Sequence, residues 1–455
     1  MIRKKLFLIC LLPAFCSFSP KNSTPRPDGG KTQKDYVDYF SGYLAGDKTA
    51  YGTSKKLSPK AVEKAQTAVW NSWKAANSAF TEEKLGPLQP LDKERSGSWD
   101  LTAYEPNAVM PYYYGTKGAA KPEAGWPLFL YLHGSGPKER EWSNGIRLSS
   151  GFDDAPSAYF IPQIPNEGSY YRWWQRAKQH AWEKLLRQTF ASGEIDPNRV
   201  YFFGISEGAY GSQRLASFYA DYLAGAGPIA GGEPLQNAPA ENCANMAFTL
   251  RTGENDRGFS RHILTANTKA EFDRLEKLHP GYYKHNIEVV PGATHTSVDY
   301  KPTTPWMKGY TRNPHPKYVY WENFDMDGRY RDGFYNLYVK ERSDDNSARS
   351  CYEMTIDGNT VDLKVNTVTY KVAEKDRIGI PLKFDKTYTP ATKGRVVIYL
   401  NDKLVDLSKP VTVKVNGQEV FKGKPELNTA NLVNSCAAFF DPERLYPAAV
   451  EVEVR

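Results

Sequence analysis

The sequence predicts an α/β protein: a mostly parallel sheet with flanking helices, followed by a C-terminal all-β domain of sandwich type. In residues 99–312, near-continuous apolar runs alternate with helix-like segments, as in a parallel sheet that helices cover on both faces. From residue 316 onward, helical periodicity gives way to short alternating strands bounded by Gly, Asn, Asp and Pro. There, Asn416-Gly417 joins two such strands and is a strong signal for a two-residue hairpin.

The chain has 455 residues, more than a typical domain, and its composition changes divide it into four segments. We expect a signal peptide in residues 1–19, a tether and helical segment in 20–98, an α/β catalytic domain in 99–312 and a β-sandwich-like domain in 316–455. The stretch from residue 20 to about residue 33 is rich in Pro, Gly, Ser and Lys, which is typical of a mobile tether. Ser58-Pro59 then predicts the start of a helix that continues to residue 80.

The N-terminus predicts export. Three basic residues precede the apolar residues 6–15, a stretch that is too short to span a membrane and matches a secretory signal. Cys16 stands where a bacterial lipoprotein signal places its lipidated cysteine, but Phe15 is bulky where such signals need a small residue. A lipid anchor through Cys16 therefore stays open, and the expected location is the periplasm, the cell surface or the extracellular space.

Three cysteines remain beyond the signal, namely Cys243, Cys351 and Cys436. Export permits a disulfide, and the two cysteines of the C-terminal region are the expected pair. Cys243 is then left over, and we expect it to be a free, buried thiol.

The composition argues against several classes of partner. The net charge is +7, and no dense Lys/Arg cluster follows the N-terminus, so no nucleic acid partner is expected. Aromatic residues make up 13% of the chain, a surplus that is common in β-rich and carbohydrate-handling proteins. No histidine pair has zinc-ligand spacing, and the acidic run in residues 325–333 lacks the calcium-loop pattern, so neither a metal nor a cofactor is expected.

The expected elements of the α/β region alternate along the chain. The strands are expected in residues 107–115, 126–134, 158–165, 199–206, 225–232, 245–253 and 286–292. The helices are expected in residues 171–193, from Ser206 to about Tyr222, and in residues 268–279.

The stretch Gly204-Ile205-Ser206-Glu207-Gly208 is the clearest chemical signal. It lies between an expected strand and an expected helix, where a sharp turn lifts a serine hydroxyl above the edge of a sheet. The two glycines leave room for the crowded backbone, and the helix start offers N–H groups that favour negative charge. Alone, the pattern has a plain explanation too, since glycine is common in turns and serine at helix starts. The two explanations are distinguished by whether a base, an acid and oxyanion donors lie near this serine.

A nucleophilic serine needs a base, and the base needs an orienting acid. His295 is the best-placed histidine, because it follows a strand and lies on the loop side where Ser206 emerges, whereas His285 precedes that same strand. The acid is expected in the loop after the strand of residues 245–253, which offers Glu254 and Asp256. Asp256 is preferred because it lies farther round the turn and Gly258 follows it, and Glu254 remains a competitor.

Residues 133–136, His-Gly-Ser-Gly, directly follow another central strand. A glycine-bearing turn there allows a backbone N–H to face a substrate oxygen, and with the N–H of Glu207 it would form a two-donor oxyanion site. Ser135 is the expected second donor, with Gly134 next. His133 is expected to be a structural anchor rather than a base.

Aromatic residues follow the expected strand of residues 158–165 on the active-site side of the sheet. Trp174 is the preferred candidate for stacking on a sugar or an aromatic acyl group. Packing of this ring in the core at the helix start explains it equally well.

Residues from about 100 to 310 resemble α/β-hydrolases of the esterase/depolymerase branch, which includes feruloyl and acetyl-xylan esterases and polyhydroxyalkanoate depolymerases. The motifs that carry the resemblance are LFLYLHGSG, FIPQIP with YRWW, IDPNRVYFFGISEGAYGS, TGEND and GATHTS. The resemblance implies an eight-stranded sheet, an acyl-serine intermediate and the chain order Ser206, Asp256, His295. Glu207 departs from the pattern, since many relatives carry Met or Gln there, and its carboxylate, if exposed, argues against strongly acidic substrates.

Three functions follow as hypotheses. The first is an exported serine hydrolase that cleaves carboxylic esters, either of small molecules or on polysaccharides. The second is a serine peptidase of the same fold, although no gating domain of propeller size is apparent in the sequence. The third is a non-catalytic, glycan-binding surface protein that has kept the hydrolase fold.

Overall fold

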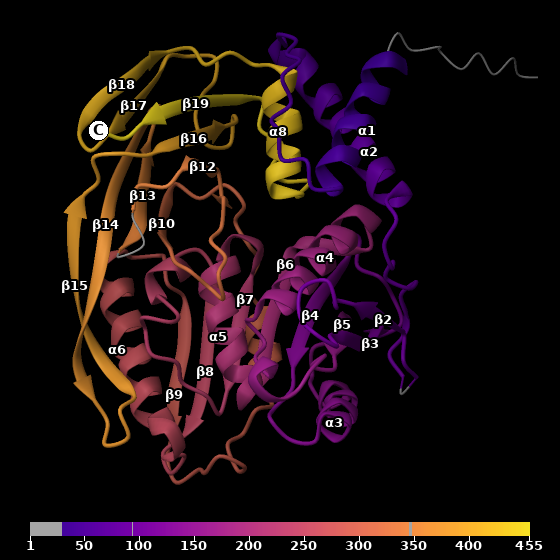
Figure 1. Cartoon of the computed structure of the whole chain (residues 1–455), viewed down its shortest axis with the longest axis vertical. Helices are drawn as coiled ribbons and strands as arrows, with labels where there is room; N and C mark the ends of the chain where they lie inside the picture. Colours follow the sequence, from indigo (N-terminus) through magenta and orange to yellow (C-terminus); the bar gives the residue numbers. More distant parts are fainter. Residues whose placement is uncertain (1–29, 93, 345–347) are drawn as a thin grey trace, which may run out of the picture.

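The computed structural model describes residues 30–92, 94–344 and 348–455 (Figure 1). The predicted signal peptide, the possible lipidated Cys16 and most of the predicted tether lie outside the described residues. In the described part of the chain, no helix has both the length and the apolarity to cross a membrane.

A nine-stranded sheet forms the centre of the α/β region, in the order β1-β3-β5-β4-β6-β7-β8-β9, with β2 paired to β3. The strands β4 to β9 are parallel to their neighbours, whereas β3 runs antiparallel to β5 and β2 antiparallel to β3. Their bounds are β1 Gln89–Pro90, β2 Gly97–Asp100, β3 Val109–Lys117, β4 Trp126–Leu132, β5 Ser157–Pro162, β6 Ile195–Ile205, β7 Gly225–Ile229, β8 Ala247–Gly253 and β9 His285–Val290. Every residue of β4, β5 and β7 is buried, which explains their continuous apolar runs.

Helices cover both faces of this sheet. Leu130 packs with the cluster of α4, α5 and α6, and its neighbour Tyr131 packs with that of α3 and α7. The helices are α3 Lys138–Ser150, α4 Arg176–Ser192, α5 Glu207–Tyr219, α6 Arg261–Leu278 and α7 Thr303–Lys308, with short 3-10 turns η2 Gly168–Tyr170, η3 Ala220–Tyr222, η4 Ala240–Cys243 and η5 Gly258–Ser260. We did not predict α3 or α7, because α3 buries few of its residues and α7 is only six residues long.

Two further sheets follow. One has the order β10-β13-β14-β17-β18, with β15 paired to β14, and the other has the order β11-β12-β16-β19. Their bounds are β10 Tyr318–Asn323, β11 Gly333–Phe334, β12 Leu337–Glu341, β13 Arg349–Asp357, β14 Thr360–Lys375, β15 Pro381–Pro390, β16 Arg395–Leu400, β17 Val411–Val415, β18 Gln418–Gly423 and β19 Ala448–Glu453. Asn416 and Gly417 have φ values of 48° and 81°, as a two-residue turn with positive φ at both positions requires. The predicted fold class is confirmed.

One helix interrupts the C-terminal sheets, so our expectation of an all-β region is wrong at this point. Helix α8, Thr429–Phe439, begins after Asn428, whose side chain accepts a hydrogen bond of 2.9 Å from the N–H of Asn431. Its buried face packs against the N-terminal helix α2, Val62–Ala79. The pairing explains why α8 forms far from other helices in the sequence.

The N-terminal segment differs from the sequence prediction in two details. Helix α1, Gly30–Leu44, starts inside the stretch that we expected to be tether. Ser58 precedes a 3-10 turn, η1 Pro59–Ala61, and its side chain makes no capping hydrogen bond to α2.

Our expectation of a disulfide between Cys351 and Cys436 is wrong. Both are free and buried, as is Cys243, because Cys351 lies on β13 while Cys436 packs in the core between α2 and α8. Burial raises the pKa of all three thiols, that of Cys243 to about 12.

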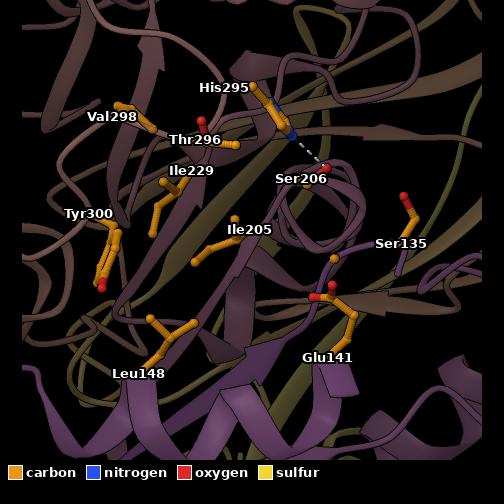
Figure 2. Close-up of a pocket in the computed structure, with 11 residues that line it drawn as sticks. Ser135, Glu141, Leu148, Ile205, Ser206, Ile229, His295, Thr296, Val298 and Tyr300 are labelled. Atoms are coloured by element: carbon orange, nitrogen blue, oxygen red, sulfur yellow. Dashed lines mark hydrogen bonds between the residues drawn. The ribbon is translucent and has the colours of Figure 1, made fainter. Parts of the chain in front are cut away.

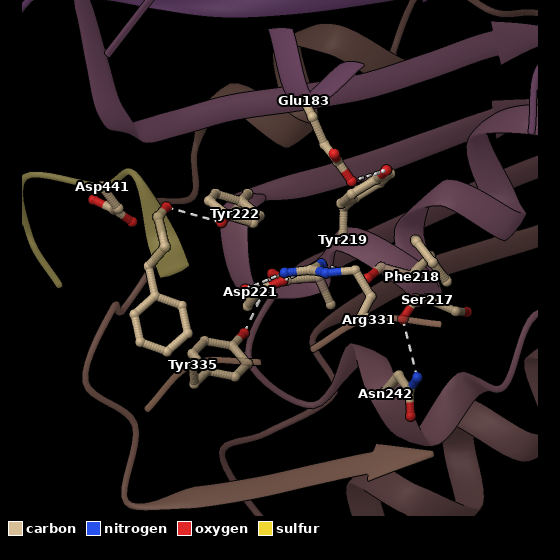
Figure 3. A network of polar contacts seen from close by, with 12 residues as sticks. Glu183, Ser217, Phe218, Tyr219, Asp221, Tyr222, Asn242, Arg331, Tyr335 and Asp441 are labelled. Atoms are coloured by element: carbon tan, nitrogen blue, oxygen red, sulfur yellow. Dashed lines mark hydrogen bonds and ion pairs between the residues drawn. The ribbon is translucent and has the colours of Figure 1, made fainter. Parts of the chain in front are cut away.

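A buried ion-pair network joins the α/β region to the C-terminal sheets (Figure 3). Asp221, in η3, pairs with Arg331 at 2.9 Å and with Arg444 at 2.6 Å. Arg444 also contacts Asp441 at 2.8 Å, and Arg312 reaches the same carboxylate at 2.7 Å. Both carboxylates are completely buried, so each depends on its guanidinium partners to offset the loss of hydration.

Replacing Asp221 with Asn should therefore destabilise the protein. The variant leaves Arg331 and Arg444 buried without a full counter-charge, and we expect a loss of about 3 kcal/mol in the free energy of unfolding. Urea denaturation followed by far-UV circular dichroism measures this loss. The control is Lys340→Met, which removes an ion pair whose two side chains are 40% and 41% exposed and should change stability by less than about 0.5 kcal/mol. Equal losses in the two variants would contradict the role assigned to the network.

Candidate active site

Ser206 occupies the sharp corner between β6 and α5. Its φ and ψ of 58° and −110° lie outside the common regions for a residue with a side chain, and its N–H donates to the Ile229 carbonyl at 3.0 Å. The corner places the hydroxyl at the carboxyl end of the parallel strands, where ligands bind in such sheets. Backbone strain at a non-glycine residue of this kind is typical of functional sites.

The glycines on either side of Ser206 are required by close packing. A Cβ on Gly208 would overlap the Leu132 carbonyl at the end of β4, and one on Gly204 would overlap the carbonyls of Gly208 and Leu132. Glycine therefore flanks Ser206 for a steric reason. The corner packs against the end of β4, and a side chain at either position would collide with backbone carbonyls.

The structure brings the three predicted side chains together. Figure 2 shows the hydrogen bond between His295 and Ser206. The Nε2 atom of His295 lies 3.0 Å from the Ser206 hydroxyl, and its Nδ1 atom lies 2.6 Å from the Asp256 carboxylate. With Nδ1–H donating to Asp256, Nε2 is free to accept the serine proton. Asp256 is buried, whereas the His295 side chain is 34% exposed, so a substrate can reach the imidazole from the solvent.

Asp256 has a second partner that we did not predict. Arg261 donates to its other carboxylate oxygen from Nη1 at 3.0 Å and donates to the Tyr210 hydroxyl from Nε at 2.7 Å. Burial alone would raise the pKa of Asp256, but the hydrogen bond from His295 and the charge of Arg261 outweigh it, so the pKa lies below its ordinary value. The carboxylate is therefore ionised at neutral pH.

The competing acid, Glu254, does not contact His295. Its carboxylate accepts a hydrogen bond of 2.8 Å from the N–H of Gly292, at the start of the loop that carries His295. Glu254 therefore fastens this loop, and Asp256 is the carboxylate that contacts the imidazole.

The end of β4 supplies the other expected parts. His133 is fully buried: its Nε2 accepts from the Ile164 N–H at 3.0 Å, and burial lowers its pKa to about 4. It is a neutral anchor of this turn, consistent with the structural role expected of it. Ser135 is exposed beside Ser206, and neither its N–H nor that of Glu207 has an acceptor among the described residues. Both donors are thus available for a substrate oxygen.

Two cavities, each of about 410 Å³, flank Ser206 and share Ser135. The first, drawn in Figure 2, has an apolar floor beside the imidazole. It is lined by Gly134, Ser135, Glu141, Leu148, Ile205, Ser206, Ile229, His295, Thr296, Val298 and Tyr300. The second combines aromatic and charged side chains, and Glu207, Arg214, Glu233 and Arg261 contribute to it.

The structure places Trp174 in the wall of the second cavity. The guanidinium of Arg214 lies 3.8 Å from the centroid of the indole, and Glu233 binds that guanidinium at 2.8 Å. One face of the ring is thus already covered by a cation. Trp174 can contact a ligand only through the rest of its surface.

Glu207 carries a buried carboxyl group and directly follows Ser206 in the chain. One of its oxygens lies 3.4 Å from Arg172, and the other has no hydrogen-bond partner within the described residues. Burial raises the pKa of Glu207 to about 7, although the nearby arginines oppose this shift. At neutral pH the carboxyl is therefore only partly ionised.

The described residues hold no cluster of three metal-ligating side chains. Three residues of this site, Arg261, Tyr210 and Ile380, were not predicted from the sequence. An arginine five residues after the acid was the one available signal for Arg261, whereas Ile380 lies far along the chain, between β14 and β15.

Comparisons with known proteins give local and distant similarities. No protein-family model matches the chain. A stretch of 50 residues is 52% identical to poly(3-hydroxyalkanoate) depolymerase C of Paucimonas lemoignei, which covers 11% of this chain and only 12% of that relative. Among solved structures, a thermostable esterase aligns with a TM-score of 0.34 and 18% identity over 45% of this chain and 60% of its own. Est1E from Butyrivibrio proteoclasticus also aligns with a TM-score of 0.34, at 13% identity over 48% of this chain and 97% of its own.

Proposed function

We propose that the protein is a serine hydrolase that cleaves carboxylic esters through an acyl-serine intermediate. The observation that carries the proposal is the continuous chain of hydrogen bonds from Ser206 through His295 to Asp256, at 3.0 and 2.6 Å. The local similarity to a poly(3-hydroxyalkanoate) depolymerase, an enzyme named for cleaving a polymer, supports the proposal.

The reaction follows from the geometry. His295 takes the proton of Ser206 as the hydroxyl oxygen attacks the ester carbonyl, and Asp256 stabilises the imidazolium that forms. The imidazolium then gives its proton to the leaving alcohol, which leaves the acyl group on Ser206. A water molecule, activated by the same imidazole, attacks the acyl carbon and releases the acid. The second half repeats the first with water in place of serine.

Two backbone N–H donors stabilise the negative charge that develops on the carbonyl oxygen. The N–H groups of Ser135 and Glu207 are both free for this task, and the latter lies at the start of α5, where the helix favours negative charge. We propose that the substrate is an ester of a small molecule or of a polysaccharide, and that the protein acts outside the cytoplasm, either free or anchored by a lipid on Cys16.

Ser206→Ala should abolish ester cleavage. The variant loses the nucleophile, so turnover of p-nitrophenyl acetate should fall by at least about 10³-fold, while circular dichroism shows an unchanged fold. A fluorophosphonate probe should label the wild-type protein and leave the variant unlabelled. Retained turnover by a clean preparation of the variant would reject the proposal.

Asp256→Asn and Glu254→Gln separate the two acids of the same loop. Asn cannot stabilise the imidazolium and favours the wrong tautomer of His295, so we expect kcat to fall by about 10³- to 10⁴-fold. Glu254→Gln keeps an oxygen acceptor for the Gly292 N–H and should retain activity within about threefold. Steady-state kinetics on one p-nitrophenyl ester measures both, and a larger loss in Glu254→Gln would reverse the assignment.

Glu207→Gln should change how stability depends on pH. The folded pKa of about 7 exceeds the ordinary value of about 4.3, so between these pH values the folded protein keeps a proton that the unfolded chain has lost. Wild-type stability therefore falls as pH rises through this window, and the full cost remains above pH 7. The variant lacks this titration, so its stability relative to the wild type should rise by roughly 1–3 kcal/mol from about pH 4.5 to 8. A difference between the urea midpoints that is constant with pH would contradict the shifted pKa.

A further inference from the structure

The C-terminal sheets reach the active site through one long ribbon. Strands β14 and β15 pair in antiparallel fashion as far as Lys375 and Pro381, and in Figure 1 they run beside α6, away from the rest of their sheet. The turn between them, residues 376–380, ends at Ile380, which lines the second cavity together with Ser206. A residue more than 170 positions after the serine thus shares a cavity wall with it.

The tip of the ribbon is an ordered turn. The Asp376 carboxylate accepts hydrogen bonds from the N–H groups of Ile378 and Ile380 at 2.9 and 2.8 Å. The Asp376 N–H donates to the Ile380 carbonyl at 2.9 Å, and Gly379 adopts a φ of 92°, which suits glycine. These bonds fix the backbone conformation at Ile380.

The tip is also fastened to the α/β region. Ser260 donates to the second oxygen of Asp376 at 2.7 Å, and Asn267 donates to the Leu382 carbonyl at 2.9 Å. Ser260 and its neighbour Phe259 both have left-handed backbones, with φ values of 55° and 53°, in the segment that follows Asp256. The ribbon thus holds the loop that carries the acid, and Ile380 stays at the cavity.

The two cavities correspond to the two halves of an ester. His295 must reach the leaving oxygen to protonate it, so the alcohol half departs along the first cavity, which His295 lines. The second cavity lacks His295 but is lined by Glu207, whose N–H we propose as a donor to the carbonyl oxygen. This proposed role places the acyl half in the second cavity.

The second cavity is large enough for a bulky acyl group. A dry cavity of about 150 Å³ accommodates benzene, whereas this one measures about 410 Å³. Its apolar and aromatic lining residues are Trp174, Tyr210, Phe259, Leu264 and Ile380. Of its charged lining residues, Arg214 pairs with Glu233, Arg172 pairs with Glu207, and Arg261 pairs with Asp256, which lies outside the lining. Such a lining favours a carbon skeleton larger than acetyl.

We propose that the second cavity is the acyl subsite, that it takes acyl groups with an aromatic or branched apolar body, and that Ile380 of the β14–β15 ribbon forms its outer wall and sets this preference. The proposal rests on the esterase function proposed above. It gives the C-terminal sheets a direct part in substrate selection.

The test compares Ile380→Ser with Ile378→Ser on two esters that share one leaving group, p-nitrophenyl acetate and p-nitrophenyl 3-phenylpropanoate. Ile378 is the matched control, because it lies on the same turn, is 61% exposed and does not line the cavity. For Ile380→Ser we expect kcat/KM on the phenylpropanoate to fall about tenfold and that on the acetate to change less than about twofold. For Ile378→Ser both values should stay at the wild-type level.

Equal effects of Ile380→Ser on the two esters, or the same selective loss in Ile378→Ser, would overturn the assignment. Binding of 3-phenylpropanoate, measured by calorimetry, separates this failure from failure of the proposed function. If the wild type cleaved neither ester and took no fluorophosphonate label, the esterase function would be wrong. In that case, a tenfold weaker affinity of Ile380→Ser for 3-phenylpropanoate would still support the subsite, and an equal affinity would reject it too.

Discussion

The close approach between the β6–α5 corner and the end of β4 is the constraint on which the site depends. Because Gly208 touches the Leu132 carbonyl, the helix start and the turn after β4 share one small volume. That contact places Glu207, Ser135 and Ser206 along one cavity. A single steric condition thus positions the serine that we propose as the nucleophile and the two residues whose N–H groups we propose as oxyanion donors.

A second constraint lies just beyond the C-terminal end of α5. There, η3 carries Asp221, whose carboxylate is buried against Arg331 and Arg444 from the C-terminal part of the chain. Charges buried in this way tolerate few alternative arrangements, so they fix how the C-terminal sheets sit on the α/β region. The β14–β15 ribbon extends from one of those sheets. Its tip is therefore held at a fixed position beside the loop that carries Asp256, where Ser260 donates a hydrogen bond to Asp376.

Features that depend on a short stretch of sequence could be predicted from the sequence alone. The apolar runs predicted the buried strands, and the order of strand, glycine-flanked serine and helix predicted the corner at Ser206. The sequence favoured Asp256 but kept Glu254 as a competitor, because two carboxylates two residues apart on one turn differ mainly in where the folded loop points them. Ile380 escaped prediction because it reaches the site through a tertiary contact that has no sequence period. Arg261 lies only five residues after Asp256, but an arginine at that spacing is not a specific signal. The helix α8 was missed because its apolar face is matched by α2, some 370 residues earlier.

Arg261 contacts Asp256 and also lines the second cavity, which we propose as the acyl subsite. One of its nitrogens holds Asp256 and another holds Tyr210, while its guanidinium lines the cavity that Ile380 closes. The same segment, through Ser260, is bound to the ribbon tip. If the cavity takes the acyl group as we propose, that group contacts the same segment that orients the Asp256 carboxylate. Direct contacts then link the wall of the cavity to the hydrogen bonds between Asp256 and His295.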